Sequence, residues 1–326
     1  MKSMNDELQR IFFNTTSSCN LKCYYCYASA RRRIDRDMLS LNDVKNLAEA
    51  GRRCGTKSVV LSGGEPLIRK DWVEIFSIFD DYDYQLAVST NACLINKNSI
   101  CKFSSFKDII FQVSLDGDEQ TMDKISGVLG TFKRVTRAID LLISNGFEVQ
   151  INTVVHNENY HCLPFLIKYS FERKIALRLT ILNTDYGLAR NKSHILSLEK
   201  LIRIIKAIHI ARTANPYIEL NIPPLLLHHD DWFPISPSCG WVHHQCGVLS
   251  NGDVTICGLA TDFNELIAGN LRKQPLDFIW DNSELFKKLR SYTKEDLKGV
   301  CRICPFIDAC GGSCRLTPYA KNRDFC

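Results

Sequence analysis

Three cysteines near the N-terminus, Cys19, Cys23 and Cys26, have the spacing C-x3-C-x2-C. Thiolates are soft ligands that suit zinc and iron–sulfur clusters. An iron–sulfur cluster is normally held by four cysteines, so three on one loop would hold three corners of a [4Fe–4S] cube and leave one iron open to an exogenous ligand. Two other interpretations are a zinc loop, which more often uses paired C-x2-C units, and cysteines scattered in the core.

Two further features lie near this cysteine loop in the expected fold. Tyr25 directly precedes the third cysteine, and Gly63, Gly64 and Glu65 form a second motif, followed by Pro66. Glycines let another group approach the backbone closely, and a carboxylate accepts hydrogen bonds from an ammonium group. The two motifs together favour the cluster interpretation over zinc or a plain core.

A second group of cysteines fills the C-terminal part of the chain. Its members are Cys239, Cys246, Cys257, Cys301, Cys304, Cys310, Cys314 and Cys326. Asn251 and Gly252 lie between Cys246 and Cys257 and are flanked by apolar residues. This pattern predicts a hairpin with a tight turn. One or two structural zinc sites would also satisfy these spacings.

The elements that must position these residues alternate between strands and helices. Six segments have the β-branched residues and turn endings of strands: Arg10–Thr15, Ser58–Leu61, Gln85–Ser89, Ile109–Leu115, Glu148–Val155 and Ala176–Leu182. Amphipathic helices lie between them, one opened by a capping pair of Ser40 and Asp43. This order predicts an α/β fold with a parallel sheet, open or partly closed because eight units would be needed for a full barrel. Functional groups are then expected at the carboxyl ends of the strands.

Composition sets the remaining limits. The 326 residues carry 15 cysteines and a dispersed net charge of +5, which implies no nucleic-acid partner. No signal-like segment or run of about 18 apolar residues is present, so we expect a cytoplasmic protein that does not enter a membrane. Thiols stay reduced in the cytosol, which favours metal binding over disulfides. The composition predicts a barrel domain at 1–215, a proline-rich linker at 216–237 and a cysteine-rich module at 238–326.

The N-terminal motifs resemble those of the radical S-adenosylmethionine (SAM) enzymes. The resemblance implies a (β/α)6 partial TIM barrel and a [4Fe–4S] cluster whose open iron binds SAM. It also implies that the reduced cluster cleaves SAM to a 5′-deoxyadenosyl radical, which abstracts hydrogen from a substrate. The cofactor-binding residues that it implies are Tyr25, Gly63, Gly64, Glu65, Ser114, Asn152, Arg178 and Leu182.

The C-terminal cysteines resemble the SPASM module of peptide-modifying radical SAM enzymes, which implies two auxiliary [4Fe–4S] clusters. Auxiliary cluster I would take Cys239, Cys257 and Cys314, with Cys246 as the expected fourth ligand. Cys239 and Cys246 could exchange roles, and without Cys246 the cluster would keep an open iron. The resemblance assigns auxiliary cluster II to Cys301, Cys304, Cys310 and Cys326.

The resemblance favours an enzyme that modifies a ribosomally made peptide by a crosslink, a thioether or epimerisation. The resemblance extends in architecture to the anaerobic sulfatase maturases and the PQQ-pathway radical SAM enzymes. Alternatives are an anaerobic sulfatase maturase, disfavoured by Gly258 where those enzymes carry an aspartate, and an enzyme of haem or small-molecule cofactor synthesis. A zinc-stabilised binding module is the non-enzymatic alternative. Expected partners are the peptide, a separate peptide-recognition protein, and a flavodoxin or ferredoxin as electron donor. Cys93, after the third strand, is a candidate hydrogen-atom donor.

Overall fold

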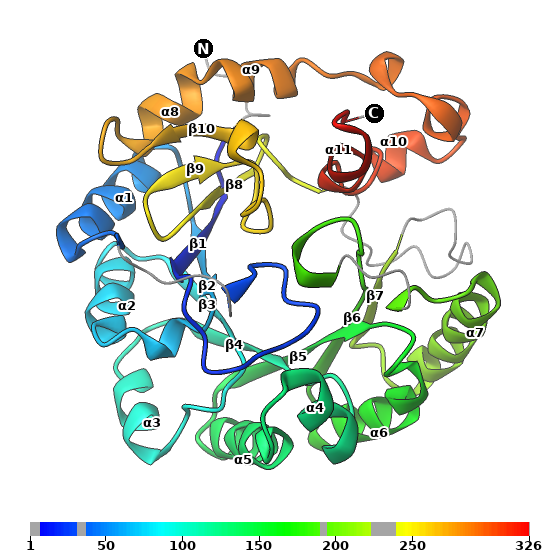
Figure 1. The fold of residues 1–326 in the computed structure, drawn as a ribbon. Coiled ribbons are helices and arrows are strands. Elements are labelled where there is room, and N and C mark those ends of the chain that lie inside the picture. The colour runs from blue at the N-terminus through cyan, green and yellow to red at the C-terminus, as the bar shows by residue number, and fades with distance from the viewer. Residues whose placement is uncertain (1–6, 31–36, 190–193, 223–238, 326) are drawn as a thin grey trace.

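The computed structural model describes residues 7–30, 37–189, 194–222 and 239–325. Within these ranges, seven parallel strands in chain order form the wall of a partial barrel (Figure 1). They are β1 (Arg10–Thr16), β2 (Ser58–Gly63), β3 (Gln85–Thr90), β4 (Ile109–Ser114), β5 (Glu148–Val155), β6 (Ala176–Ile181) and β7 (Ile218–Asn221). The fold is the α/β partial barrel that the alternating elements predict.

Helices connect successive strands and surround the barrel in Figure 1. In chain order they are α1 (Leu41–Arg53), α2 (Trp72–Asp81), α3 (Lys97–Phe103), α4 (Glu119–Ser126), α5 (Thr131–Ser144), α6 (Leu163–Arg173) and α7 (Leu198–Ala214). α1 begins with the expected capping pair, because Ser40 Oγ accepts from Asp43 N (3.2 Å) and Asp43 Oδ2 accepts from Ser40 N (2.9 Å). These bonds satisfy backbone groups that a helix start leaves without partners.

Side chains alternate between two faces of each strand. In β4 and β5, Phe111 and Ile151 are fully buried, whereas Gln112 and Asn152 are partly exposed. Phe111 packs on Phe103 of α3, with ring centroids 4.8 Å apart. The helix-facing side of the sheet therefore forms the hydrophobic core, and the opposite side gives the barrel a polar inner surface.

All six predicted strands are present, with ends that differ by at most two residues. The seventh strand, β7, lies inside the segment 216–237 where we expect a linker. It pairs in parallel with β6, and its Ile218 and Leu220 are buried. Four residues are too few for a clear alternation pattern, which is why composition alone suggests a linker. The rest of that segment, 223–237, lies outside the described residues.

The C-terminal part continues the same sheet. Its elements are β8 (Gln245–Val248), β9 (Asp253–Thr255), β10 (Ile267–Asn270), α8 (Leu276–Asn282), α9 (Glu284–Arg290), α10 (Ile307–Cys310) and α11 (Leu316–Asn322). β8 pairs in parallel with β1, and β9 returns antiparallel to β8 through the predicted turn, where Gly252 has a φ of +89°. The cysteine-rich module is thus joined to the barrel edge to edge, and the domain boundaries at 215 and 238 stay predictions.

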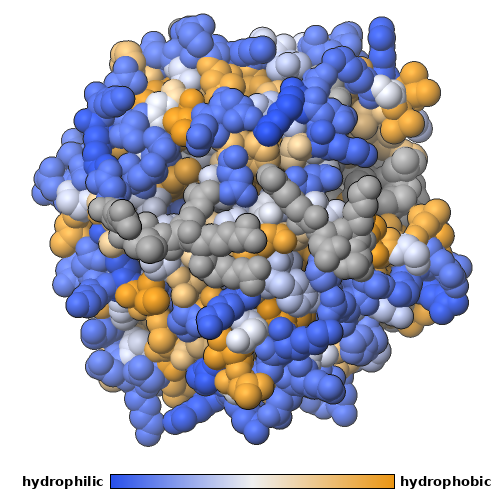
Figure 2. Space-filling model, viewed as in Figure 1, coloured by the Kyte–Doolittle hydropathy of each residue, from blue (hydrophilic) through white to orange (hydrophobic). Residues whose placement is uncertain are grey.

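The face in Figure 2 is largely hydrophilic at its rim, with hydrophobic residues in separate patches. In the part of the chain that the structure describes, we find no helix with the length and apolar character needed to cross a bilayer.

Candidate functional site

The cysteine loop begins where β1 ends and is fixed to the end of β2 through the backbone. Gly64 N donates to Thr16 O (2.8 Å), and Glu65 N donates to Ser18 O (2.9 Å). A Cβ on Gly64 would lie 2.0 Å from Ser18 O, and one on Gly63 would lie 2.2 Å from Thr16 O. Both glycines are therefore required by the close approach of the two segments, which places the glycine motif beside the first cysteine.

Two further backbone contacts hold the middle and the end of the loop. Lys22 N donates to the carbonyl of Ser126 at the end of α4 (2.8 Å), and Leu188 N, after β6, donates to the carbonyl of Cys26 (3.0 Å). The loop thus runs across the carboxyl ends of the barrel strands, as the dark-blue segment at the centre of Figure 1 shows. This is where ligands bind in parallel α/β proteins.

The three thiols lie near one another and are partly buried. Burial raises the pKa of Cys19 to about 12, and the charges of Glu65 and Cys26 contribute in the same direction. Burial also raises the pKa of Cys23, which lies near Asp116 and Cys26. Within the described ranges, no group of three or more His, Cys, Asp or Glu side chains is arranged to hold one metal ion. Three soft thiols on one partly buried loop fit a multi-iron cluster, which would displace their protons on binding.

Glu65 is fully buried and presents a hydrogen-bonded carboxylate. Its Oε1 accepts from Thr90 Oγ1 (2.7 Å) and Leu67 N (3.2 Å), and its Oε2 accepts from Asn91 N (2.8 Å). Burial raises the pKa of Glu65 to about 7, although these hydrogen bonds lower it. A carboxylate has about four lone-pair positions, so these three bonds leave room for a further donor such as an ammonium group.

Tyr25 is held by an acidic residue that the sequence analysis did not select. Its hydroxyl donates to Asp116 Oδ2, and Val154 N donates to Asp116 Oδ1 (2.8 Å). Asp116 is 2 % exposed, and burial raises its pKa to about 6. The sequence does contain a signal for Asp116. This residue follows the carboxyl end of the fourth strand, where ligands bind in parallel α/β proteins and where a polar side chain is rarely needed for packing.

His156 is a second residue that the sequence analysis missed, and it contacts the loop through Tyr24. Glu158 N donates to His156 Nδ1 (3.1 Å), so the neutral ring carries its proton on Nε2, which lies 3.3 Å from the Tyr24 hydroxyl. Burial and the neighbouring His194 lower the pKa of His156 to about 4. Tyr24 also stacks on His194, with ring centroids 4.7 Å apart. The contacts of Tyr24 with His156 and His194 hold the loop between its second and third cysteines.

The other expected cofactor-binding residues lie side by side on the inner face. Ser114 of β4 is opposite Asn152 of β5, which is opposite Arg178 of β6. Asn152 Oδ1 is buried and has no hydrogen-bond partner among the described residues, so it is available to a ligand. Arg178 is engaged, because its Nε donates to Glu219 Oε2 (2.8 Å). Leu182 follows β6, where its N donates to Val155 O (2.9 Å).

Cys93 lies at the end of β3, beside the start of α5. Its thiol is close to Arg134, and burial raises its pKa. The residue of this segment that reaches the cysteine loop is Asn91, whose Nδ2 donates to Asn20 Oδ1 (2.9 Å) and lies 3.8 Å from Cys19 Sγ. A role for Cys93 as a hydrogen-atom donor stays a prediction.

The C-terminal cysteines divide into groups. Cys239, Cys257 and Cys314 lie near one another, since Cys239 and Cys314 both contribute to the raised pKa of Cys257, after burial. Cys246 is not brought to this group and lies instead near Cys54. Of the cysteines expected to hold a second auxiliary cluster, Cys301 lies in a short 3-10 segment (Gly299–Ile303), Cys304 directly follows this segment, and Cys310 ends α10; all three are partly exposed. Cys326 lies outside the described residues.

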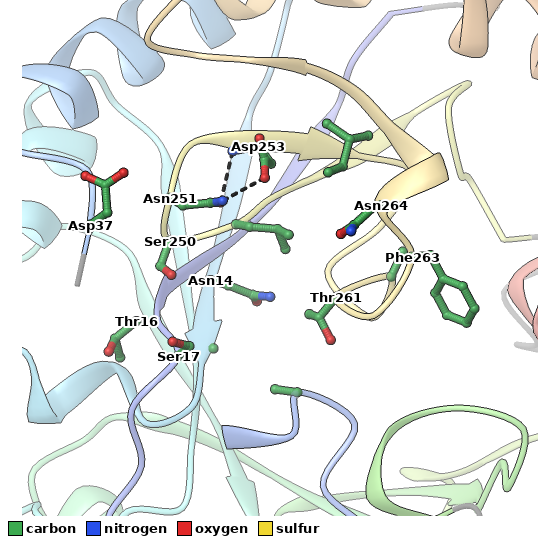
Figure 3. Close-up of a pocket in the computed structure, with 15 residues that line it drawn as sticks. Asn14, Thr16, Ser17, Asp37, Ser250, Asn251, Asp253, Thr261, Phe263 and Asn264 are labelled. Atoms are coloured by element: carbon green, nitrogen blue, oxygen red, sulfur yellow. Dashed lines mark hydrogen bonds between the residues drawn. The ribbon is translucent and has the colours of Figure 1, made fainter. Parts of the chain in front are cut away.

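A pocket of about 500 Å³ opens between the cysteine loop and the residues that follow Cys257 (Figure 3). Amide and hydroxyl side chains line much of it: Asn14, Thr16, Ser17, Ser250, Asn251, Thr261 and Asn264. Its two carboxylates are engaged, because Asp37 pairs with Arg272 (2.6 Å) and Asp253 accepts from Asn251 Nδ2 (2.7 Å). The pocket is therefore rich in neutral hydrogen-bonding groups.

Comparison with known proteins agrees with this geometry. The radical SAM superfamily profile matches residues 13–169, and the SPASM iron–sulfur cluster-binding domain matches residues 239–305. The chain is 27 % identical over 342 residues to the AdoMet-dependent heme synthase of Methanosarcina barkeri, covering 100 % of this chain and 96 % of that protein. It is 25 % identical to the PqqA peptide cyclase of Bradyrhizobium diazoefficiens, covering 96 % and 83 %.

Solved structures show the same fold. SuiB of Streptococcus suis bound to its precursor peptide SuiA superposes with a TM-score of 0.81 at 19 % identity, covering 98 % of this chain and 74 % of that one. Native anSMEcpe with bound AdoMet superposes with a TM-score of 0.74 at 19 % identity, covering 94 % and 89 %. With its three-cysteine loop, its partial barrel and its cysteine-rich C-terminal part, the chain belongs to the radical SAM superfamily and is an enzyme with a SPASM domain that binds a [4Fe–4S] cluster and SAM.

Proposed function

We propose that this enzyme abstracts hydrogen from a peptide and thereby starts a crosslink, a thioether or an epimerisation. The observation that carries the proposal is the pocket between the cysteine loop and the segment after Cys257. Its neutral amide and hydroxyl side chains suit a peptide backbone, which offers N–H and C=O groups in equal number. Relatives named as a peptide cyclase and a mycofactocin maturase support a peptide substrate.

In this proposal the barrel holds SAM and excludes water. Glu65 accepts from the amino group of SAM, Asn152 Oδ1 accepts from a second donor, and Ser114 lies next to Asn152 on the inner face. Tyr25 is fixed by Asp116 at the edge of the cofactor site. When bound, the cluster supplies the electron for reductive cleavage of SAM, and a flavodoxin or ferredoxin supplies that electron to the protein.

Replacing Glu65 by glutamine is expected to weaken SAM binding by about 10- to 100-fold, since a hydrogen bond to a charged group is worth about 1.5–3 kcal/mol. In the wild type, the dissociation constant should rise as the pH falls below about 7, because the carboxyl then becomes protonated and loses its charge. The glutamine variant should bind weakly at every pH. Anaerobic equilibrium dialysis measures both, with Glu74→Gln on the exposed side of α2 as the matched control. Equal affinity of the wild type and Glu65→Gln would remove Glu65 from the cofactor site.

Haem synthesis is the second candidate. It is favoured by the sequence similarity to the heme synthase of Methanosarcina barkeri, which extends over 96 % of that protein. The sulfatase-maturase alternative is disfavoured because Gly258 stands where those enzymes carry an aspartate.

A direct test separates the two candidates. The reconstituted enzyme is incubated with SAM, a reductant and either a panel of cysteine-containing peptides or iron-coproporphyrin III, and the products are analysed by mass spectrometry. We expect 5′-deoxyadenosine together with a peptide that has lost hydrogen or changed its stereochemistry. A changed mass of the porphyrin with unchanged peptides would replace this proposal by the second candidate.

A further inference from the structure

We propose that Arg69 is a positioning residue for the N-terminal cluster. Its guanidinium joins the two ends of the chain segment that carries Cys19, Cys23 and Cys26, and so holds the loop in the shape that receives the cluster. Arg69 acts through the backbone and needs no contact with the cluster or with SAM. The proposal is independent of the substrate, because it concerns only the loop that holds the cluster.

Arg69 is buried, and each of its three guanidinium nitrogens has a partner. Its side chain is 4 % exposed. Nη1 donates to the carbonyl of Thr15 (2.9 Å), and Nη2 donates to the carbonyl of Leu39 (2.6 Å). Nε and Nη2 also donate to the two carboxylate oxygens of Asp71, at 2.7 and 3.0 Å. A guanidinium suits such a bridge, because it is planar and its N–H donors point in fixed directions.

The first of the two carbonyls belongs to a β-bulge. β1 pairs with β2 up to Asn14, and the register shifts before Thr16, so Thr15 has no opposite residue in β2. A bulge bends its strand and leaves the extra residue out of the ladder. Thr15 is 1 % exposed, and a buried carbonyl without a partner costs free energy. Arg69 supplies a partner where the chain leaves the sheet and enters the cysteine loop.

The second carbonyl lies where the chain returns from the loop. Leu39 directly precedes Ser40, the N-cap of α1, and is fully buried. Its N donates to Ser250 O in the turn between β8 and β9 (2.8 Å), and Ser250 lines the pocket. Arg69 therefore bridges the start and the end of the cysteine segment, and through Leu39 it connects both to the C-terminal part.

A short 3-10 turn, Pro66–Ile68, connects Arg69 to the cofactor site. Glu65, proposed above as the acceptor for the amino group of SAM, precedes this turn and caps it, because Glu65 Oε1 accepts from Leu67 N (3.2 Å). Arg69 follows the turn, and its N donates to Pro66 O (3.4 Å). The cofactor contact and the bridge across the loop thus lie at the two ends of one turn.

Replacing Arg69 by lysine tests the bridge. Lysine keeps the positive charge and can still pair with Asp71, but its single compact ammonium group cannot bridge both carbonyls as well. We expect anaerobically reconstituted Arg69→Lys to lose about four irons per chain and to keep the C-terminal iron. SAM should no longer shift the electron paramagnetic resonance signal of the reduced protein. Circular dichroism should show the helix content of the wild type.

Two matched variants separate the bridge from the ion pair and from other contacts of the same segment. Asp71→Asn removes the negative charge and leaves Arg69 bonded to both carbonyls. Arg272→Lys makes the same exchange in a second arginine, whose Nη1 donates to Asp37 Oδ2 (2.6 Å) and whose Nη2 donates to Met38 O (3.1 Å). Both controls should keep the iron content of the wild type.

Three results would overturn the proposal. The first is a folded Arg69→Lys protein with full iron content, because the loop would then hold its cluster without the bridge. The second is a loss of iron in either control as large as in Arg69→Lys. The third is an Arg69→Lys protein that does not fold while both controls do, because the guanidinium would then serve the whole fold rather than the cysteine loop.

Discussion

Replacing Cys23 by alanine is expected to abolish the reductive cleavage of SAM and to lower the iron content by about four atoms per chain. Cys23 is the middle thiol of the loop and lies close to Cys19 and Cys26. With two thiols left, the cluster keeps too few ligands on one tight loop to be retained. The C-terminal cysteines are not affected, so their iron should stay.

The measurement is 5′-deoxyadenosine formed with a strong chemical reductant, together with iron content and circular dichroism. Cys101→Ala is the matched control, since this cysteine is exposed on α3. It should cleave SAM like the wild type. A Cys23→Ala protein that still forms 5′-deoxyadenosine at the wild-type rate would contradict the assignment of the three-cysteine loop as the SAM site.

The barrel strands could be predicted because their signal is local. In β5, buried Val149 and Ile151 alternate with the partly exposed Gln150 and Asn152, and this pattern is visible in the sequence without any knowledge of neighbours. β7 has the same pattern in only four residues, and its place in the sheet depends on pairing with β6. The short strand therefore becomes visible only in the folded chain.

Sequence alone does not predict the features of the site that depend on contacts between distant segments, such as the strand face on which a cysteine lies. The spacing of the cysteines indicates the ligand sets, but it does not say which face of a strand each one occupies. A shift of one residue reverses the face, and this is why Cys246 lies between Cys239 and Cys257 in sequence and is nevertheless buried in the core opposite Ile11. Asp116 was missed because its role comes from Tyr25, 91 residues away in the chain.

The other large effect is expected for Gly64→Ala, which should prevent assembly of the N-terminal cluster and destabilise the fold by about 1–3 kcal/mol. The new methyl group would lie 2.0 Å from Ser18 O and 2.5 Å from the Ser18 carbonyl carbon. These are backbone atoms and cannot rotate away as a flexible side chain would. The start of the cysteine loop must therefore move away from β2, which displaces Cys19 and breaks the bond from Glu65 N to Ser18 O.

Gly146→Ala separates this steric effect from general destabilisation. Gly146 has a φ of +80°, which strains any L-residue, but a Cβ there would meet nothing within 4 Å. Left-handed backbone costs a non-glycine residue roughly 1–2 kcal/mol, so both variants should unfold at lower denaturant concentration than the wild type. Only Gly64→Ala should also lose about four irons and SAM binding. A Gly64→Ala protein with full iron content would mean that the loop tolerates a displacement from β2, and that the glycine motif is not what fixes the cysteines in place.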